Sequence, residues 1–583
     1  MRAIGRKSPR HSSLSRLCNL QPVIFLVMSM KPKIKIRTPS LIAALAALSA
    51  SAALAADYTS PQTIVDGTTV TYNDGDTFTV TSGRNITIGN GANMDIAGDG
   101  AIHFVNNSAT DSQNTSIHLP GTNTDASTVN LGNGSTFSSN SRIVHFGSTA
   151  ETDGRRTLTG SNLTLTVGSV DTPITATTYS MVYLQNTDAN VGADTRMTLY
   201  STGASNSIVE INRGSVFTAT DGFHAEFLGN ATMPGAGSSN VLYIVGNSTL
   251  NVGTNALIKN EAGQGITVGV STEVGDTLNI GEGSVIEAAT QGLRVNARGA
   301  AINANGATIN AGNNGIQANQ DLTANLDDTT ITAGAWGIAI NDGTTDQATV
   351  STVTISGGGV HSQGNSDAAA FGLIASSSTG VGSTTTVTLT DGAQVTSDTG
   401  IFYKDYTYAG SGDVESDAAL NLLLNGAGTR AEGVVLDSTG VISLSVTDGA
   451  TWASAGASVL DNLTLGGGTV ELLLGAASAD AIVTISDTVV FGGTLHLGTG
   501  DGFVAAAGNA WNVFDFVTGA STGRFDVVVD YALGEGLYWD YSTLYADGIV
   551  RITDVNPAVP EPATYAALAA LAMLVYVAVR RRR

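Results

Sequence analysis

The stretch that decides the fold is TLNIGEGSVI, residues 277–286, in which two short runs of alternating apolar and polar residues flank a turn at Gly283. Alternation with a period of two is typical of β-strands, and glycine suits tight turns. The theme returns at residues 128–137 (TVNLGNGSTF), 208–217 (IVEINRGSVF), 386–395 (TVTLTDGAQV) and 442–452 (ISLSVTDGATW), with turn glycines Gly134, Gly214, Gly392 and Gly449. The last two follow Asp391 and Asp448, a pairing that favours tight turns. The sequence therefore predicts a repeated strand–turn–strand unit.

Composition decides between two all-β architectures for this unit. Hairpin-linked sandwiches need aromatic-rich cores, yet Phe, Trp and Tyr make up only 6% of the 583 residues. A parallel β-helix needs short strands of small and β-branched residues with Gly, Asn and Asp at its corners. Residues 235–556 contain no proline, which fits continuous hydrogen-bonded ladders. We therefore expect a right-handed parallel β-helix (a solenoid) over residues 56–480.

Within this rod, Ile302, Ala304, Ile309 and Ala311 are expected to face inward. The corners are expected to hold stacked side-chain amides, from Asn303, Asn305, Asn310, Asn313 and Asn314. A repeat of roughly 20 to 25 residues predicts on the order of 18 turns.

Residues 481–556 change character and are predicted to form a C-terminal β capping module. They carry Trp511 and Trp539 in strand-like runs, and terminal repeats of solenoids need caps. The segment around residues 537–550 resembles the closing segment of exported bacterial proteins built from autotransporter-associated β-strand repeats; the residues concerned are Leu537, Tyr538, Trp539, Leu544, Gly548 and Val550. Seventy such residues are too few for a membrane barrel of their own, so the body is expected to be passenger-like.

The charge is unevenly distributed along the chain. Residues 57–558 contain 13 basic and 48 acidic residues, a net charge of −35, although the whole chain is at −23. A nucleic-acid partner is excluded because such binding needs a basic face. Acidic polymers are expected to be repelled in the same way, unless a cation bridges them.

The N-terminal residues 1–55 are predicted to be a signal peptide region, with Met30 as the true start. Positive charges at Lys31–Arg37 precede an apolar run at residues 41–48 and a small-x-small site, Ala53-Leu54-Ala55, before Ala56. This order is typical of a secretory signal, so the Sec translocon and signal peptidase are the expected partners. Residues 22–28 are an alternative, longer apolar part of that signal. The only cysteine, Cys18, lies in this region, which excludes thiol chemistry and disulfides from the mature chain.

The C-terminal residues 557–583 are predicted to be a sorting signal. Pro560, Glu561 and Pro562 precede an apolar run over residues 563–579, and Arg580, Arg581, Arg582 and Arg583 end the chain. A helix of that run would be about 25 Å long, enough to cross a thin bilayer, with the arginines as a cytoplasmic membrane stop. The three elements resemble the PEP-CTERM sorting signal of Gram-negative bacteria. That resemblance implies recognition near Pro560–Pro562 by an exosortase-type membrane protease, which removes the tail; a permanent anchor is the alternative.

Catalytic patterns are weak. Asn186-Thr187-Asp188 and Asp327-Asp328 resemble polygalacturonase segments, but the Gly-His-Gly and Arg-Ile-Lys segments of that family are missing. The histidines have no metal-ligand spacing, so His118, His145 and the others are interpreted as isolated polar residues. Asn73, Asp74 and Asp76 are only part of a calcium loop. We predict no catalytic residue, no metal and no cofactor.

The expected protein is therefore exported and non-catalytic, anchored in the inner membrane before processing and then at the cell surface or extracellular. Its expected role is structural or adhesive, as an extracellular-matrix or biofilm component associated with exopolysaccharide. The alternative is a carbohydrate-active β-helical enzyme, a polysaccharide lyase or hydrolase. A groove lined by stacked carboxylates or aromatic side chains would favour the enzyme.

Overall fold

The computed structural model describes residues 54–556, Met573 and Arg580, apart from residues 109–113, 123, 149–152, 177, 204, 230–238, 271, 273, 342–347, 365–367, 376–382, 408–417, 437–439, 477, 479 and 518. The chain divides into two units, Met1–Leu54 and Ala55–Arg583. All elements described below belong to the second unit.

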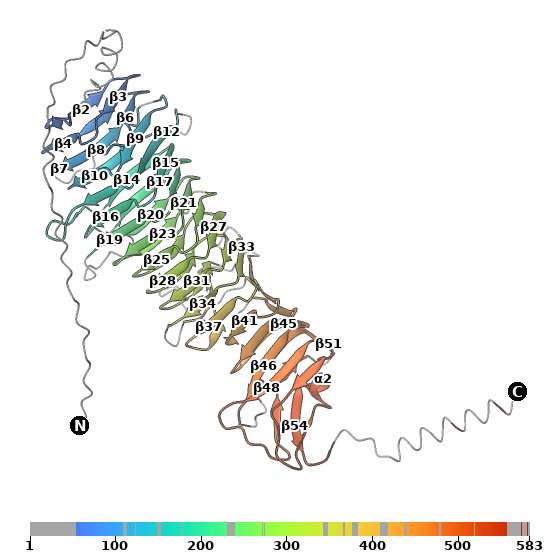
Figure 1. Cartoon of the computed structure of the whole chain (residues 1–583). Coiled ribbons are helices and arrows are strands. Elements are labelled where there is room, and N and C mark those ends of the chain that lie inside the picture. Colours follow the sequence, from blue (N-terminus) through green and yellow to red (C-terminus); the bar gives the residue numbers. More distant parts are fainter. Residues whose placement is uncertain are drawn as a thin grey trace, which may run out of the picture. The chain divides into compact units, whose positions relative to one another are not determined.

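The body is built from three long parallel sheets, A, B and C (Figure 1). Successive strands of the chain belong to sheet A, then B, then C, and this order repeats in the next turn. Sheet A begins with β1 (Asp57–Tyr58) and ends with β52 (Val527–Val529), and sheet C begins with β3 (Thr69–Tyr72) and ends with β50 (Phe514–Phe516) and β51 (Ser521–Gly523). Sheet B consists of β2 (Gln62–Ile64), β5 (Ile86–Ile88), β8 (Thr115–Leu119), β11 (Arg142–Phe146), β14 (Thr178–Gln185), β17 (Ser205–Asn212), β20 (Asn240–Ile244), β23 (Gln264–Val268), β26 (Leu293–Val295), β29 (Ile316–Ala318), β32 (Ile338–Asn341), β35 (Phe371–Ala375), β38 (Ile401–Tyr403), β39 (Tyr406–Thr407) and β42 (Val434–Val435).

The two strands of a repeated unit do not pair with each other, which excludes the hairpin architecture. In residues 277–286, β24 (Thr277–Ile280) pairs in sheet C with β27 (Ala300–Asn305), whereas β25 (Val285–Ala288) pairs in sheet A with β28 (Thr308–Ala311). Each strand thus pairs with its counterpart one turn later. The all-β prediction with long parallel sheets is confirmed, and the arrangement is consistent with a β-helix.

The length of a turn varies more than the sequence theme suggests. Thr451 pairs with Thr469, 18 residues on, whereas Gln394 pairs with Arg430, 36 residues on. Sheet A contains 18 strands, of which 16 lie within residues 56–480, close to the number of turns expected there. Among the described residues the 18-residue turn contains no sheet-B strand, because sheet B ends before it at β42.

Tight turns join the strands of the repeated units. Asp391 and Gly392 both have positive φ, 53° and 85°, between β36 (Thr384–Thr390) and β37 (Gln394–Ser397). Asn and Asp residues tolerate this left-handed backbone region, and glycine adopts it without strain. The predicted Asp-Gly turn is therefore confirmed, but it changes the direction of the chain between sheets C and A.

The core consists of inward side chains stacked in register. Phe78 in β4 (Thr77–Val80), Phe104 in β7 (His103–Asn106) and Phe137 in β10 (Thr136–Ser139) are at most 2% exposed, with ring centroids 4.7 Å and 4.6 Å apart. Ile302, Ala304, Ile309 and Ala311 are buried as predicted. Burial of each large apolar side chain contributes roughly 1.5–3 kcal/mol, so the stacks stabilise each turn against its neighbours.

A ladder of asparagine side chains runs along sheet C. Nδ2 of Asn279 donates to Oδ1 of Asn251 (2.7 Å), Asn303 to Asn279 (2.9 Å) and Asn325 to Asn303 (3.0 Å). The predicted amide stacking is therefore present at Asn303. Its place was predicted wrongly: the ladder lies on the outer face of strands and not at a corner, because in-register strands repeat the same position every turn.

The architecture changes toward the C-terminal end of the body. Among the described residues, sheet B ends at β42, whereas sheets A and C continue to residues 523–529. A three-stranded antiparallel sheet then forms from β49 (Ala510–Asn512), β54 (Ile549–Thr553) and β53 (Tyr538–Asp540), next to the short helix α2 (Leu544–Asp547).

No helix within the described part of the chain is long and apolar enough to span a membrane. The predicted transmembrane segment 563–579 lies, except for Met573, outside the described residues.

Candidate functional site

The residues predicted for processing lie at the two ends of the body. Ala53, Pro560, Glu561, Pro562 and Arg581–Arg583 are outside the described residues, whereas Ala55, Ala56 and Arg580 are described. The expected roles of these residues therefore stay predictions. The contacts described next are those of Ala56, which follows the predicted cleavage site.

Ala56 is already part of the first turn. Its amide N donates to Oδ1 of Asp76 (2.7 Å), and its carbonyl accepts from the Thr77 amide (2.9 Å). Asp76 is fully buried, and its Oδ2 accepts from the Asn73 amide (2.9 Å). Cleavage after Ala55 would place the new α-ammonium group beside this carboxylate, where a charge-assisted hydrogen bond is stronger than a neutral one.

Replacing Asp76 by asparagine is expected to destabilise the first turn by about 1–3 kcal/mol. The side-chain NH₂ would then face a backbone N–H, and two donors cannot form a hydrogen bond with each other. Hydrogen exchange of residues 57–80 measures the loss. Asp57→Asn, at an exposed position, makes the same charge change and is the control. Equal protection in both variants would refute the role of Asp76.

A second group of polar residues lies on sheet B, where in-register pairing brings distant residues together. His118 in β8 is opposite His145 in β11, His145 is opposite Tyr183 in β14, and Tyr183 is opposite Glu210 in β17. Neighbouring strands of a sheet are about 4.8 Å apart. These four side chains therefore form a row across four consecutive turns.

Their contacts, with those of Arg142 and Ser180, form one network. The His145 ring packs edge-on against those of His118 and Tyr183, with centroids 5.0 Å and 5.2 Å away. The Arg142 guanidinium lies over the Tyr183 ring, with Cζ 5.1 Å from the centroid. Nε of Arg142 donates to the Ser180 carbonyl (2.8 Å), and the Ser180 hydroxyl donates to Oε2 of Glu210 (2.5 Å). Tyr183 and Ser180 thus hold Arg142 in place.

Burial keeps both imidazoles neutral at neutral pH. Burial, then the charges of Arg84, His145 and Arg142, lower the pKa of His118 to about 3. Burial, then Arg142 and Arg84, lower the pKa of His145 to about 4. Burial also raises the pKa of Glu210, although the Ser180 hydrogen bond and Arg142 oppose this. Arg142 supplies the positive charge of the network, and Glu210 supplies its carboxyl group.

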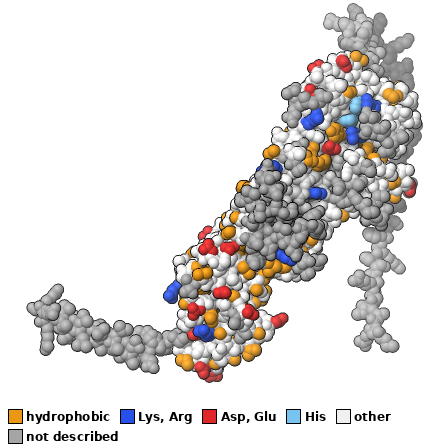
Figure 2. All heavy atoms as spheres, turned by 180° about the vertical axis from the view of Figure 1, so that it is seen from behind, with side chains coloured by type: hydrophobic (Ala, Val, Ile, Leu, Met, Phe, Trp, Pro, Cys, Tyr) orange, Lys and Arg blue, Asp and Glu red, His pale blue; other side chains and the backbone are white. Residues whose placement is uncertain are grey.

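These side chains border a hollow of about 490 Å³ whose lining includes Arg142, His145, Tyr179, Tyr183 and Glu210. We call it the sheet-B hollow. The Tyr179 hydroxyl and Nδ1 of His145 have no hydrogen-bond partner among the described residues. Figure 2 shows histidine side chains (pale blue) beside basic side chains (blue) on this part of the body. Aromatic, cationic and unpaired polar groups therefore converge at one place, as in small-molecule sites.

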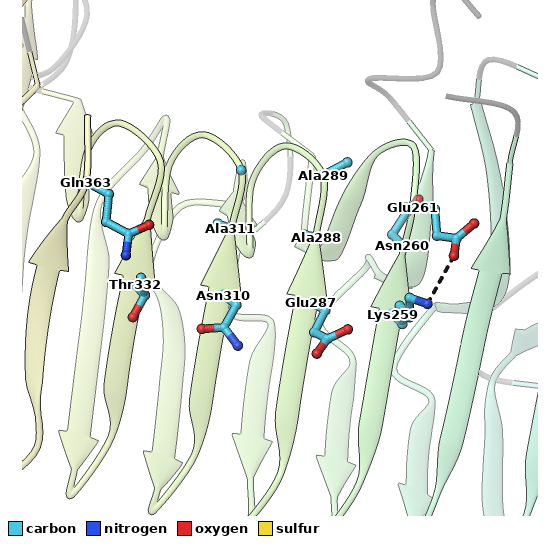
Figure 3. A pocket seen from close by; sticks show the side chains of 11 residues that line it. Lys259, Asn260, Glu261, Glu287, Ala288, Ala289, Asn310, Ala311, Thr332 and Gln363 are labelled. Atoms are coloured by element: carbon cyan, nitrogen blue, oxygen red, sulfur yellow. Dashed lines mark ion pairs between the residues drawn. The ribbon is translucent and has the colours of Figure 1, made fainter. Parts of the chain in front are cut away.

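A second hollow, of about 440 Å³, lies on sheet A (Figure 3). Lys259, Glu287, Asn310 and Thr332 follow one another in register along it. Nζ of Lys259 pairs with Oε1 of Glu261 at 3.0 Å, and alanines and a glycine occupy the next positions. Because its cation is paired, this surface points to no particular ligand.

The segments that resemble polygalacturonase residues do not meet. Asp188 in β15 (Thr187–Val191) and Asp327 in β30 (Leu322–Asp327) are five turns apart in sheet C, or about 24 Å, whereas a glycosidase pair needs roughly 5–10 Å. Both oxygens of Asp188 also accept from Arg155, at 2.5 Å. Among the described residues no cluster of three metal-ligating side chains occurs.

The interpretation of His118 and His145 as isolated residues is wrong. They are 27 positions apart and Tyr183 follows 38 positions later, so no fixed spacing reveals the row. The signal that was available is the alternation within each strand: SIHL (residues 116–119), IVHF (143–146) and MVYL (181–184) each place His118, His145 or Tyr183 between apolar residues. Aligning such strands one turn apart would have brought the residues together.

Comparison with known families concerns the C-terminal end. Residues 558–583 match the family model of the PEP-CTERM protein-sorting motif, which confirms the motif predicted there. No curated protein matches the chain. The motif implies processing by an exosortase-type membrane protease, and it suggests an exported protein that is membrane-anchored before it is processed.

Proposed function

We propose that this chain is a non-catalytic surface or extracellular-matrix protein that associates with exopolysaccharide. The observation that carries the proposal is the sorting motif at residues 558–583. The proposed route begins with signal-peptide cleavage before Ala56. A transmembrane helix at residues 563–579, stopped by Arg580–Arg583, then holds the chain in the membrane. Removal of the tail near Pro560–Pro562 completes the route. An acidic body with net charge −35 remains outside the membrane in this orientation.

The proposed body is a right-handed parallel β-helix closed by the antiparallel sheet of β49, β54 and β53. Its passenger-like shape suits a structural or adhesive role, because a stack of turns exposes long, regular faces. The asparagine ladder supports this role, since neutral amides on an outer face offer repeated hydrogen-bonding groups to a polymer.

Replacing Pro560, Glu561 and Pro562 by alanine is expected to stop processing, so that the full-length chain accumulates in the inner membrane. Membrane fractionation with mass determination of the C-terminal peptide measures this. The double variant Val555→Ala/Asn556→Ala lies outside the matched motif and is expected to be processed normally. Normal processing of the triple variant would contradict the sorting proposal.

One observation favours the second candidate, a polysaccharide-active enzyme. The sheet-B hollow contains neutral His145 and cationic Arg142, the kinds of group that a lyase needs for proton abstraction and for holding an acidic sugar. Hydrolysis is less well supported, because Glu210 is the one carboxylate among the lining residues and glycosidases use two. Release of unsaturated oligosaccharides from uronate polymers by the processed protein would establish this activity, and its absence under the conditions of binding would exclude it.

A further inference from the structure

The guanidinium of Arg142 lies beside the sheet-B hollow. Its residue is only 9% exposed, and it forms no ion pair with any described residue. Arg155, Arg298 and Arg430 each pair with a carboxylate. A buried charge without a counter-ion is costly, and Glu210 reaches Arg142 only through Ser180. The Arg142 guanidinium therefore has no carboxylate in direct contact with it among the described residues, although Glu210 belongs to the same network.

Unpaired polar groups border the same hollow. Tyr179 is 2% exposed, and its hydroxyl has no hydrogen-bond partner in the described part of the chain. Nδ1 of His145 is likewise unpartnered there. Leaving such buried groups unsatisfied costs about 1–3 kcal/mol each. A ligand that carries hydroxyl groups as well as a negative charge would satisfy them.

We propose that the sheet-B hollow binds a carboxylated saccharide unit, with Arg142 as the counter-ion of its carboxylate and with Tyr179 and His145 as partners of its hydroxyl groups. A hollow of about 490 Å³ lies within the usual range of about 300–1,000 Å³ for small-ligand sites. The proposal deepens the exopolysaccharide association above and rests on it, because it names the polymer class.

Other ligand classes fit less well. A metal cation is disfavoured by the fixed positive charge of Arg142. A nucleic acid requires a series of cations along its backbone, whereas the body has 13 basic against 48 acidic residues. A neutral saccharide would leave the guanidinium without a directly contacting counter-ion. Net repulsion of an acidic sugar by the body is limited at physiological salt, where charges beyond about 8 Å are largely screened.

The test is calorimetric titration of the processed protein, at physiological salt, with a galacturonate trisaccharide as the probe and a galactose trisaccharide as the uncharged comparison. We expect the acidic probe to bind at least about tenfold more tightly, as befits a hydrogen-bonded ion pair. Arg142→Gln is expected to abolish that preference. Tyr179→Phe removes only the hydroxyl group and is expected to weaken binding severalfold.

Arg430→Gln is the matched control, because Arg430 lies in another sheet and already pairs with Glu432 and Glu471. It is expected to bind like the unaltered protein. Equal binding of both probes, no binding of the acidic probe, or unchanged affinity in Arg142→Gln would each overturn the proposal. Should Arg142→Gln fail to fold, unchanged affinity for the acidic probe in Tyr179→Phe would overturn the proposal. These measurements use isolated protein, so their failure is distinct from a failure of sorting, which fractionation reports.

Discussion

Phe104→Ala is expected to destabilise the N-terminal turns by about 3–5 kcal/mol, the range for removal of a buried phenylalanine. Phe104 is 1% exposed, and its ring stacks on Phe78 and Phe137 with centroids 4.7 Å and 4.6 Å away. Its loss leaves a cavity that touches two interfaces between turns. Because each turn of a solenoid contacts mainly its neighbours, the effect should be local.

Urea denaturation combined with hydrogen exchange of residues 77–139 measures that loss and its extent. Val170→Ala is the control, since Val170 is 79% exposed and surface substitutions change stability by about 0.5 kcal/mol or less. A loss below about 1 kcal/mol in Phe104→Ala would contradict the stacked core, because truncation of a packed phenylalanine is not that mild.

Gly548→Ala is expected to disrupt the C-terminal antiparallel sheet. Gly548 ends helix α2 with φ 69°, and an added Cβ would overlap the Phe514 carbonyl oxygen. The Gly548 carbonyl also accepts from the amides of Val513 (2.9 Å) and Phe514 (3.2 Å). Left-handed backbone costs a non-glycine residue about 1–2 kcal/mol, and overpacking adds about 1–3 kcal/mol, so we expect a loss of about 3 kcal/mol or more.

Gly536→Ala separates these two contributions. Gly536 also has positive φ, 79°, but nothing lies within 4 Å of its added Cβ, so only the backbone cost of about 1–2 kcal/mol remains. Limited proteolysis of residues 510–553 and thermal unfolding compare the two variants. Equal stability of Gly548→Ala and Gly536→Ala would show that the close contact with Phe514 is not present.

The parallel sheets were predictable because the relevant physics is local. Residues 277–286 show a period of two and a glycine turn, and the low aromatic content disfavours a sandwich. The turn at Asp391 and Gly392 followed from the residue types alone. The variable turn length was not predictable, since a corner loop adds residues without changing the paired strands on either side of it.

The sheet-B hollow was missed for the same reason. The spacing of His118, His145 and Tyr183 depends on how many residues each corner loop holds, and this differs from turn to turn. Net charge gives a different expectation from the proposed site. A body at −35 predicts repulsion of acidic polymers, whereas the proposed binding depends on groups within a few ångströms, among them the Arg142 guanidinium.

The terminal sorting motif was recognisable because three elements occur in fixed order over a few residues: Pro560-Glu561-Pro562, an apolar run and Arg580–Arg583. A linear motif of this kind needs no tertiary structure to be read. The role of Ala56 in the first turn, by contrast, depends on its hydrogen bond to Asp76, 20 residues away, and became visible only in the fold.

Export of this acidic β-protein and its release from the sorting tail are tested most directly by one measurement. That measurement is the mass of the mature protein from the cells that make it. The predicted protein begins at Ala56, ends near Pro560–Pro562 and contains no peptide that includes Arg580–Arg583. A mature chain that still carries the Arg580–Arg583 end would contradict that release.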